Sequence, residues 1–338
     1  MSYTVGGVSQ TVPFDRVLGS IASCWHRITT VVAALLADLF ESHRSHLLAV
    51  AYRLTGSVTD AEDAVQESWL RLATTPQYEI EDLRAWLTTV VSRICLDRLR
   101  SAAVRRETYV GQWLPEPVVT APNPSSTPDP LAAVVRKQDA RFAAMIVLDN
   151  LTPPQRVAFV LHDAFSVPFD EIADILDIST DAARQLAARA RKAAARSPEP
   201  VPDPEHEAVV QRLIEAMYSG DLDRVVAVLH PDARTIGDAG GTTATAINVV
   251  TGADRVARLF LGLRRKLGFD DPAAFASGMF EPVLVNGQLG VLVHEREPGE
   301  NHPGNPRRVY GFTVADGKIW GIYDLANPAK LSGIRLSR

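Results

Sequence analysis

Small and apolar residues recur with a helical period over residues 60–72, and acidic side chains fill many of the other positions. The recurring positions are Ala61, Ala64, Val65, Ser68 and Leu72, which share one helical face. The remaining polar or aromatic positions are Asp60, Glu62, Asp63, Gln66, Glu67 and Trp69. The pattern predicts an amphipathic helix that buries one face and presents an acidic face outward.

A second helical period covers residues 83–100, with Trp86, Val90 and Ile94 among its apolar positions. The stretch from Arg93 to Arg106 carries five cations and one Asp. We therefore expect an acidic helix and a basic helix in the same unit, with the two charge signs on separate surfaces.

Residues 169–196 show the pattern of a helix-turn-helix. Ile172, Leu176 and Ile178 supply its expected apolar spine, and Ser179 is suited to cap the second helix. That helix and its end carry five cations against one Asp, on a chain whose formal charge is −5. Concentrated positive charge on a helix of an acidic protein favours contact with phosphates and base edges in a major groove. A solvated amphipathic helix is the alternative that this segment alone leaves open.

The chain is long enough for two or three domains, with 338 residues of which 46% are hydrophobic. Its cysteines, Cys24 and Cys95, lie far apart without a CxxC motif, so we expect neither a disulfide framework nor a metal site. This suits a reducing cytoplasm. The apolar run 28–36 is shorter than the roughly 20 residues of a membrane-spanning helix. We expect no membrane contact and no cofactor.

Two proline-rich stretches, residues 111–130 and 197–204, are expected to be linkers because proline disfavours both helix and central strand. They divide the chain into units at residues 38–110, 131–196 and 205–338. Residues 1–37 are expected to be a poorly ordered extension.

The third unit changes from helical to strand patterns. Helices are predicted at residues 205–219, 221–229 and 254–267. Asn286-Gly287 and Asp316-Gly317 each lie between two apolar runs, which is a strong signal for a tight β-hairpin. This order predicts an α+β unit in which a curved sheet wraps on helices.

The residues of the first two units resemble bacterial RNA polymerase sigma factors of the extracytoplasmic-function class. Residues 60–70 resemble the helix that binds core polymerase, residues 84–93 the promoter −10 helix, and residues 152–191 the −35-binding region. The resemblance implies two all-α sigma domains, a region 2 bundle and a region 4 helix-turn-helix. It also implies two partners, promoter DNA and core RNA polymerase through the clamp of its β′ subunit.

Site residues follow from this resemblance together with the charge pattern. The expected polymerase-binding residues are Asp60, Glu62, Asp63, Gln66, Glu67 and Trp69. The expected −10 contacts are Arg84, Trp86, Ser92, Arg93, Arg98 and Arg100. The expected −35 contacts are Arg184, Gln185 and Arg189, with Arg191 and Lys192 on phosphates.

The remaining motifs resemble sigma factors with a fused SnoaL-like domain, an NTF2-type cone, among them the SigJ type. These motifs are Trp113-Leu114-Pro115-Glu116-Pro117 and Asn327-Pro328-Ala329-Lys330-Leu331. The group often shows an Asp-Gly-Gly-Gly-Lys loop, where this chain has Asp238-Ala239-Gly240-Gly241-Thr242. The residues that we expect to act between domains are Trp113, Leu114, Pro115, Glu116, Pro117, Asp238, Gly240, Gly241, Asn327, Pro328 and Lys330.

We therefore expect a sigma factor, not an enzyme, whose C-terminal domain modulates its activity. A separate anti-sigma factor would not be strictly required, and a small ligand in the cone could bias the domain arrangement. One alternative is a conventional helix-turn-helix repressor or activator that binds DNA as a dimer. Another is a bifunctional enzyme, with acid/base candidates Asp232, Asp238, His294 and Asp324 in the cone.

Overall fold

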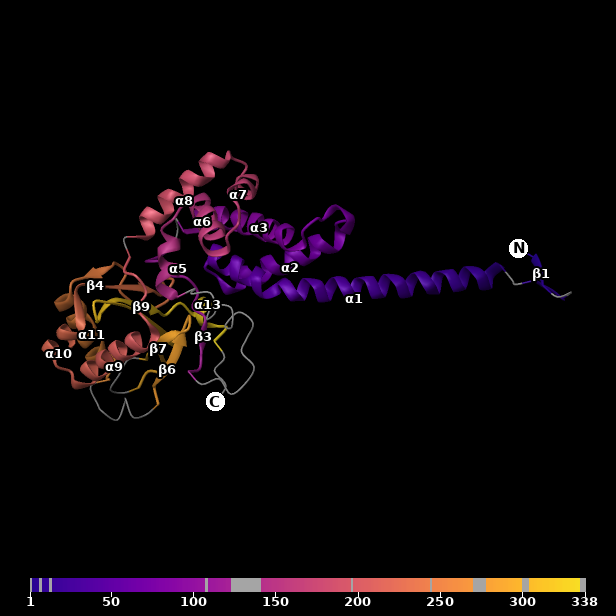
Figure 1. Ribbon diagram of the computed structural model, residues 1–338. Coiled ribbons are helices and arrows are strands. Elements are labelled where there is room, and N and C mark those ends of the chain that lie inside the picture. Colours follow the sequence, from indigo (N-terminus) through magenta and orange to yellow (C-terminus); the bar gives the residue numbers. More distant parts are fainter. Residues whose placement is uncertain are drawn as a thin grey trace.

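The computed structural model describes residues 2–5, 8–11, 14–106, 109–122, 141–195, 197–243, 245–269, 278–299 and 304–334, with side chains placed from Ala33 onward except at 103–106. Figure 1 shows two helical domains beside a domain built on a sheet, with the long helix α1 extending away from the rest.

The first domain is formed by α1 (Phe14–Thr55), α2 (Val58–Thr74), a short 3-10 turn (Gln77–Glu79) and α3 (Leu83–Arg106). The predicted buried face of α2 is confirmed, since the five recurring small and apolar residues are all buried. Ser57 begins this helix by accepting a hydrogen bond from the Asp60 N–H at 3.1 Å, which satisfies a donor that has no partner within the helix.

The expected boundary of the extension at residue 37 does not coincide with the end of an element, because α1 begins at Phe14 and runs through it. Between Phe14 and Thr55 the sequence holds no proline and one glycine, so nothing in it interrupts the helix. A β-hairpin of β1 (Ser2–Val5) and β2 (Val8–Thr11) precedes it.

The second domain contains α5 (Phe142–Asp149), α6 (Pro153–Phe159), a π-helical turn (Val160–Ala164), α7 (Phe169–Leu176) and α8 (Thr180–Ala194). The helix-turn-helix is confirmed. Asp177 turns the chain with a positive φ of 57°, and the Ser179 hydroxyl accepts from the Ala182 N–H at 3.2 Å. Ile178 was expected in the apolar spine, but it lies in the turn and is 36% exposed. Residues 131–140 lie outside the described residues.

The third domain is an α+β unit, as predicted. Its helices are α9 (Asp203–Ser219), α10 (Leu222–Val228), α11 (Ala253–Lys266) and the short α13 (Pro328–Leu331). The sheet has the order β3-β6-β7-β8-β9-β4-β5, in which β4 and β9 run parallel and the other pairs antiparallel. The strands are β3 (Val119–Thr120), β4 (Leu229–Asp238), β5 (Val250–Thr251), β6 (Phe280–Val285), β7 (Gln288–Val293), β8 (Arg308–Ala315) and β9 (Lys318–Leu325).

Both predicted hairpins form at the expected dipeptides. Asn286 and Gly287 have φ values of 49° and 84°, and Asp316 and Gly317 have 51° and 65°. Two consecutive residues with positive φ favour the tight turn whose twist matches that of paired strands. These turns fix the register of β6 with β7 and of β8 with β9.

Two of the three buried apolar clusters contain residues from more than one domain. A single buried cluster extends from Leu47 in α1 to Ala187 in α8, so the two helical domains share one core. A second cluster lies between the sheet and α9–α11. A third, which includes Leu114, Phe142 and Tyr323, lies where the helical domains meet the sheet.

The first expected linker is therefore not a free tether, because Leu114 and Val118 are buried and β3 pairs with β6. The second ends two residues earlier than expected, since α9 begins at Asp203. Within the described part of the chain, no helix combines the length and apolar character needed to cross a membrane.

Candidate functional site

The acidic face of α2 is accessible along part of its length. Glu62, Asp63 and Gln66 are exposed, whereas Asp60 and Glu67 are partly buried. Trp69 is also partly buried, because its ring packs on Phe40 of α1 with the centroids 5.3 Å apart. Three of the six residues expected to bind polymerase thus lie exposed to a partner, and the other three are partly accessible.

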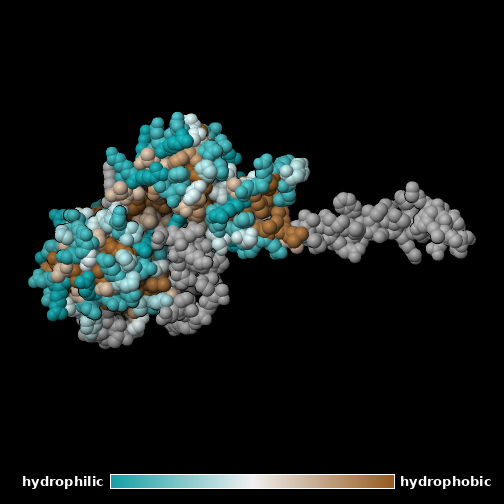
Figure 2. All heavy atoms as spheres, viewed as in Figure 1, coloured by the Kyte–Doolittle hydropathy of each residue, from teal (hydrophilic) through white to brown (hydrophobic). Residues whose placement is uncertain are grey.

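The first domain also presents an apolar patch, formed by residues of α1 and α2. Leu35 and Leu39 of α1 are 58% and 52% exposed, and Leu70 of α2 is 59% exposed. Figure 2 shows hydrophobic surface gathered there, beside α1. Exposed apolar side chains grouped beside polar ones are typical of protein–protein contact surfaces.

The expected separation of acidic and basic surfaces is wrong at Arg98. Its guanidinium lies 3.0 Å from the Asp60 carboxylate and 3.4 Å from that of Asp63. Because α2 and α3 pack side by side, the basic side chain reaches across to the acidic face. Arg98 therefore braces the two helices in this arrangement and is only 28% exposed, so it does not present a free cation to DNA.

The residues expected at the −10 element are divided between surface and core. Arg84 is exposed at the start of α3, where its guanidinium lies 3.4 Å from the His46 ring. Trp86 is partly buried and packs against the shared core. The assignment of Ser92 is wrong, because it lies on the inner face of α3 and is fully buried.

Two further arginines of α3 are exposed but differ in their contacts. Arg93 donates from its guanidinium to the backbone carbonyl of Asp174 in α7 at 2.9 Å. Arg100 lies 3.6 Å from Asp97 on its own helix. Arg93 therefore joins the −10 helix to the helix-turn-helix in this arrangement.

The outer face of α8 presents the residues expected at the −35 element. Gln185, Arg189 and Lys192 are exposed. Arg184 is also exposed and lies 2.8 Å from Asp181 in the first turn of the helix. Arg191 is held instead by Asp163, with two hydrogen bonds of 2.6 and 3.0 Å. A two-point contact of this kind fixes the guanidinium, so Arg191 is less available for phosphates.

The motif residues expected between domains converge on Asp238, at the end of β4. Its carboxylate, which is fully buried, accepts from the Leu114 N–H at 2.8 Å and from the Lys330 ammonium at 2.6 Å. It also accepts from the Tyr109 hydroxyl. The Lys330 ammonium lies 3.3 Å from the centre of the Trp113 ring, a cation–π contact. The three motifs thus form one cluster.

The turn after Asp238 fits closely against the C-terminal motif. Gly240 has a positive φ of 57°, and a Cβ there would lie 2.8 Å from the Asn327 side-chain nitrogen. Asn327 donates to the Tyr109 hydroxyl at 2.8 Å and begins α13 by accepting from the Ala329 N–H at 3.0 Å. Gly241 packs against Val110, and Pro328 is the first residue of α13. Gly240 is therefore required by both conformation and space.

The other side of the 113–118 segment is bound to the first domain. The Glu116 N–H donates to the Gly56 carbonyl at 2.8 Å, and its carboxylate accepts from the Val58 N–H at 2.8 Å. Glu116 thus caps α2, where a negative charge is favoured. Pro115 and Pro117 are buried beside it. One short segment connects the C-terminal domain to the start of the polymerase-binding helix.

Comparison with known proteins decides the family. Residues 39–105 match the Sigma-70 region 2 family and residues 144–193 match Sigma-70, region 4. The chain is 53% identical over 297 residues to the ECF RNA polymerase sigma factor SigJ of Mycobacterium tuberculosis, covering 87% of this chain and 92% of that protein. This chain belongs to the ECF sigma factors. Members of this family act with RNA polymerase in promoter-specific transcription initiation and are not enzymes.

A second relative and a solved structure also cover most of the chain. The probable ECF RNA polymerase sigma factor SigI of Mycobacterium tuberculosis is 34% identical over 303 residues, covering 88% of this chain and 94% of that protein. The crystal structure of the Mycobacterium tuberculosis SigJ matches with a TM-score of 0.75 and 50% identity, covering 89% of this chain and all of that chain. The C-terminal sheet domain is thus shared with a sigma factor of known structure.

Sequence reasoning missed three residues of the sigma factor's domain contact. Tyr52 of α1 donates its hydroxyl hydrogen to the Glu116 carbonyl at 2.8 Å, and Asn286 donates to the Tyr52 oxygen at 2.9 Å. The Asn286 side chain also accepts from the Val118 N–H at 2.9 Å. Tyr109, the third, bonds Asp238. The Asn286-Gly287 hairpin turn accounts for an asparagine at this position, so nothing in the sequence indicated that its side chain also bonds Tyr52 and Val118.

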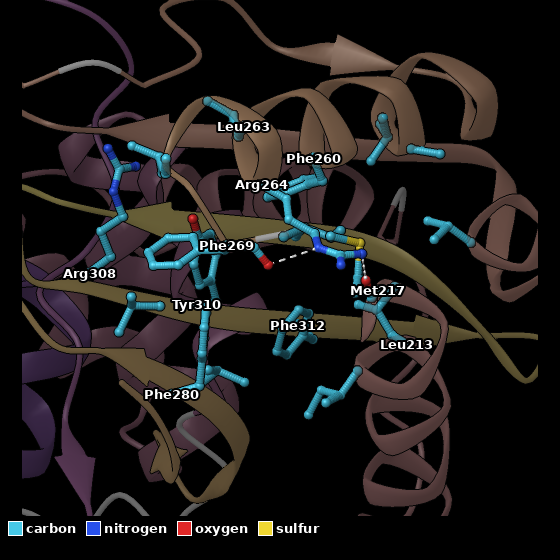
Figure 3. A pocket seen from close by; sticks show the side chains of 18 of the residues that line it. Leu213, Met217, Phe260, Leu263, Arg264, Phe269, Phe280, Arg308, Tyr310 and Phe312 are labelled. Carbon is cyan, nitrogen blue, oxygen red and sulfur yellow. Dashed lines mark hydrogen bonds between the residues drawn. The ribbon is translucent and has the colours of Figure 1, made fainter. Parts of the chain in front are cut away.

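The acid/base candidates do not meet in the cone. Its cavity, of about 270 Å³, is lined mainly by apolar and aromatic residues, with Asn305, Arg308 and Tyr310 among its polar ones. Figure 3 shows Phe260, Phe269 and Phe312 around it. None of the four candidates is among its described lining residues: Asp238 lies in the domain contact, Asp324 binds Arg308 at 2.6 Å, His294 lies 2.8 Å from Glu281, and Asp232 is exposed.

Proposed function

We propose that this sigma factor binds the clamp of the polymerase β′ subunit through the acidic face of α2 and the leucines beside it. Glu62, Asp63 and Gln66 supply the polar part of that surface. Leu39 and Leu70 supply apolar area. Charged groups at the rim of an interface direct association, and apolar groups within it contribute most of the burial.

The DNA-binding surfaces are assigned to the exposed side chains of α3 and α8. Arg84 at the start of α3 and Arg100 further along it are the −10 candidates that are both exposed and outside the contact with α7. Gln185 and Arg189 on α8 are the candidates for base edges of the −35 element, with Lys192 on a phosphate. An amide and a guanidinium can each form two hydrogen bonds to a base, which distinguishes one base from another.

The C-terminal domain is proposed to regulate initiation by holding the helical domains together. The observation that carries this proposal is the 113–118 segment, which bonds to Asp238 on one side and to Gly56 and Val58 on the other. The Arg93 contact with α7 occupies a residue of the −10 helix in the same arrangement. Regulation from within one chain does not require a separate anti-sigma factor, and we place it in the cytoplasm with the polymerase.

The test is transcription in vitro from a cognate promoter with purified core polymerase. The full chain is compared with Lys330→Met, which loosens the cluster at Asp238, and with Lys266→Met, an exposed control on α11. We expect Lys330→Met to change the amount of transcript while the start site stays the same. A changed promoter preference would show that the C-terminal domain reads DNA, and an inactive wild-type mixture would refute the assignment to initiation.

The cone is proposed to bind a neutral, mostly apolar ligand. Arg308 is paired with Asp324 at 2.6 Å, so the end of the cavity beside Arg308 and Tyr310 has little net charge. Arg264, elsewhere in the lining, donates to the backbone carbonyls of Phe269 and Met217. Tyr310 stays protonated, since burial raises the pKa of its hydroxyl far above the usual range. A carbonyl or hydroxyl group fits this end better than a carboxylate.

A further inference from the structure

Arg84, one of the two exposed −10 candidates on α3, belongs to a closed ring of hydrogen bonds. Its guanidinium Nη2 lies 3.4 Å from Nδ1 of His46 in α1. Nε2 of the same imidazole lies 2.9 Å from the Thr88 hydroxyl, which is buried one helical turn after Arg84. That hydroxyl donates to the Arg84 backbone carbonyl at 2.8 Å. The ring thus returns to the residue from which it starts.

The direction of each hydrogen bond in this ring follows from the chemistry of its groups. A guanidinium has only donors, so Nδ1 of His46 accepts from Arg84. The Thr88 hydroxyl hydrogen is directed to the Arg84 carbonyl, so the hydroxyl oxygen accepts from Nε2 of His46. The imidazole is therefore neutral and carries its hydrogen on Nε2. Neither the protonated ring nor the other tautomer can accept from Arg84.

The surroundings of His46 favour the neutral imidazole. Burial lowers the pKa of His46 to about 4, and the nearby Arg84 and His43 act in the same direction. On another side the ring meets the edge of Phe165, with the centroids 5.3 Å apart. Phe165 offers no partner to a charged imidazole. His46 is thus available as an acceptor at neutral pH.

The contact with His46 orients the Arg84 side chain and leaves most of its donors for another partner. Arg84 is exposed, and a guanidinium carries five N–H groups, of which this contact uses one. Its side chain makes no other hydrogen bond or ion pair with the described residues. A long side chain loses rotamer freedom when it binds, and a contact that already restricts it lowers this cost.

We propose that His46 is a positioning residue for promoter recognition, which holds the Arg84 guanidinium in the orientation that contacts the −10 element. Thr88 in turn holds the imidazole. Both contacts lie within the first domain, so they do not depend on how the helical domains dock. The role in recognition rests on the proposed assignment of Arg84 to DNA, whereas the tautomer of His46 does not.

The tautomer is tested by long-range proton–nitrogen NMR spectroscopy of the full-length protein with isotope-labelled histidine. The signals that disappear in His46→Gln belong to this residue. At neutral pH we expect Nε2 to carry the hydrogen and Nδ1 to carry none, and we expect Arg84→Ala to shift the Nδ1 signal. A hydrogen on Nδ1, or an Nδ1 signal that Arg84→Ala leaves unchanged, would overturn the proposal.

The positioning role is tested by the affinity of the holoenzyme for a cognate promoter. Arg84→Ala is expected to weaken binding about tenfold. His46→Gln keeps a donor for Thr88 but places no acceptor at Nδ1, so it should weaken binding about fivefold, the size of one hydrogen bond. His46→Asn places an amide oxygen near Nδ1 and should bind as the wild type does.

His43→Gln is the matched control, because His43 is a partly buried histidine of the same helix without a hydrogen bond among the described residues. It should leave the affinity unchanged. Circular dichroism and urea denaturation establish that each variant is folded. A loss in His43→Gln equal to that in His46→Gln would show a general effect on α1 and would overturn the positioning role.

The double variant Arg84→Ala with His46→Gln separates positioning from other roles. If His46 acts through Arg84, the double variant binds no more weakly than Arg84→Ala alone. Additive losses would overturn the proposal, because His46 would then act independently of Arg84. If Arg84→Ala weakens binding and His46→Gln does not, Arg84 keeps its assignment and the positioning role fails. If Arg84→Ala binds as the wild type does, the assignment of Arg84 to the −10 element fails, and the promoter role of His46 fails with it.

Discussion

The Lys330 ammonium lies 2.6 Å from the Asp238 carboxylate, and both side chains are buried between the C-terminal domain and the 113–118 segment. The same ammonium donates to the Leu114 carbonyl. This ion pair joins β4 and α13 of the sheet domain to the 113–118 segment, which contacts the start of α2. Buried pairs of this kind are sensitive to the removal of one partner, because the other charge is left in an apolar setting.

Replacing Lys330 with Met is therefore expected to lower the free energy of unfolding by about 3–5 kcal/mol. The double variant Lys330→Met with Asp238→Asn is expected to recover part of that loss, since no buried charge is left unpaired. Urea denaturation of the two variants and the wild type measures the effect. A single variant as stable as the wild type would show that the pair does not hold the domains.

Reversing charge on α2 is expected to abolish binding to core polymerase. Asp63 and Glu67 are replaced with Lys together, and both side chains reach the surface, at 58% and 39% exposed. The control exchanges Glu215 and Asp223 for Lys on the C-terminal domain, which changes the net charge equally. Binding is measured by gel filtration with purified core enzyme. Equal loss in both variants would indicate a nonspecific charge effect.

Two exposed residues of α8 are expected to affect promoter binding in different ways. Arg189→Ala should lose about 1–3 kcal/mol at the cognate −35 element and relax the choice of base at one position. Lys192→Ala should weaken binding to all sequences alike and reduce the slope of affinity against salt by about one. Binding of the holoenzyme to promoter variants is measured over a range of salt concentrations. If Lys192→Ala altered the sequence preference instead, Lys192 would be assigned to a base and Arg189 to a phosphate.

Local features of the fold were predictable because they depend on short-range patterns. The buried face of α2 follows from a period that Ala61, Ala64 and Leu72 repeat. The hairpin at Asn286 follows from the backbone conformation that Asn-Gly adopts most readily. The resemblance of their motifs led us to expect that Asp238 and Lys330 each act between domains, but the contact between them was not predicted.

The errors arose where a contact joins residues far apart in the chain. Ser92 was assigned to the surface but is buried. A small polar residue can lie on either the inner or the outer face of a helix, and the sequence does not show which face another helix will cover. Arg98 was assigned to DNA, yet its partner Asp60 lies 38 positions earlier on a helix that packs beside it. The hydrogen bonds of Tyr52 with Glu116 and Asn286 form only when whole domains dock. Hydrophobic periodicity and the helix or strand propensities of residues do not specify how domains dock.

The contact between Arg93 and Asp174 is expected to restrain the two helical domains. Arg93→Ala removes the 2.9 Å hydrogen bond to the Asp174 carbonyl and should make the free protein more open. Arg100→Ala, at an exposed position of the same helix, is the matched control. Small-angle scattering of the two variants is the measurement. If both have the wild-type radius of gyration, this bond does not limit opening.

Acidification is expected to destabilise the protein partly through His46. This side chain lies 2.9 Å from the Thr88 hydroxyl, and its ring meets the edge of Phe165 in the second domain at 5.3 Å. Burial, helped by the nearby Arg84 and His43, lowers the pKa of His46 from 6.5 to about 4. The unfolded chain therefore binds a proton before the folded chain does, and the free energy of unfolding falls as pH drops from 6.5 toward 4.

His46→Gln removes this titration while keeping a group that can bond Thr88. The loss of stability between about pH 7 and about pH 5 should be smaller in the variant than in the wild type. Urea denaturation at both pH values compares the two proteins directly, so the other titrating groups cancel. An equal loss in both would mean that His46 is protonated as readily in the folded protein as in the unfolded chain, and that its packing against Phe165 does not exclude the charged form.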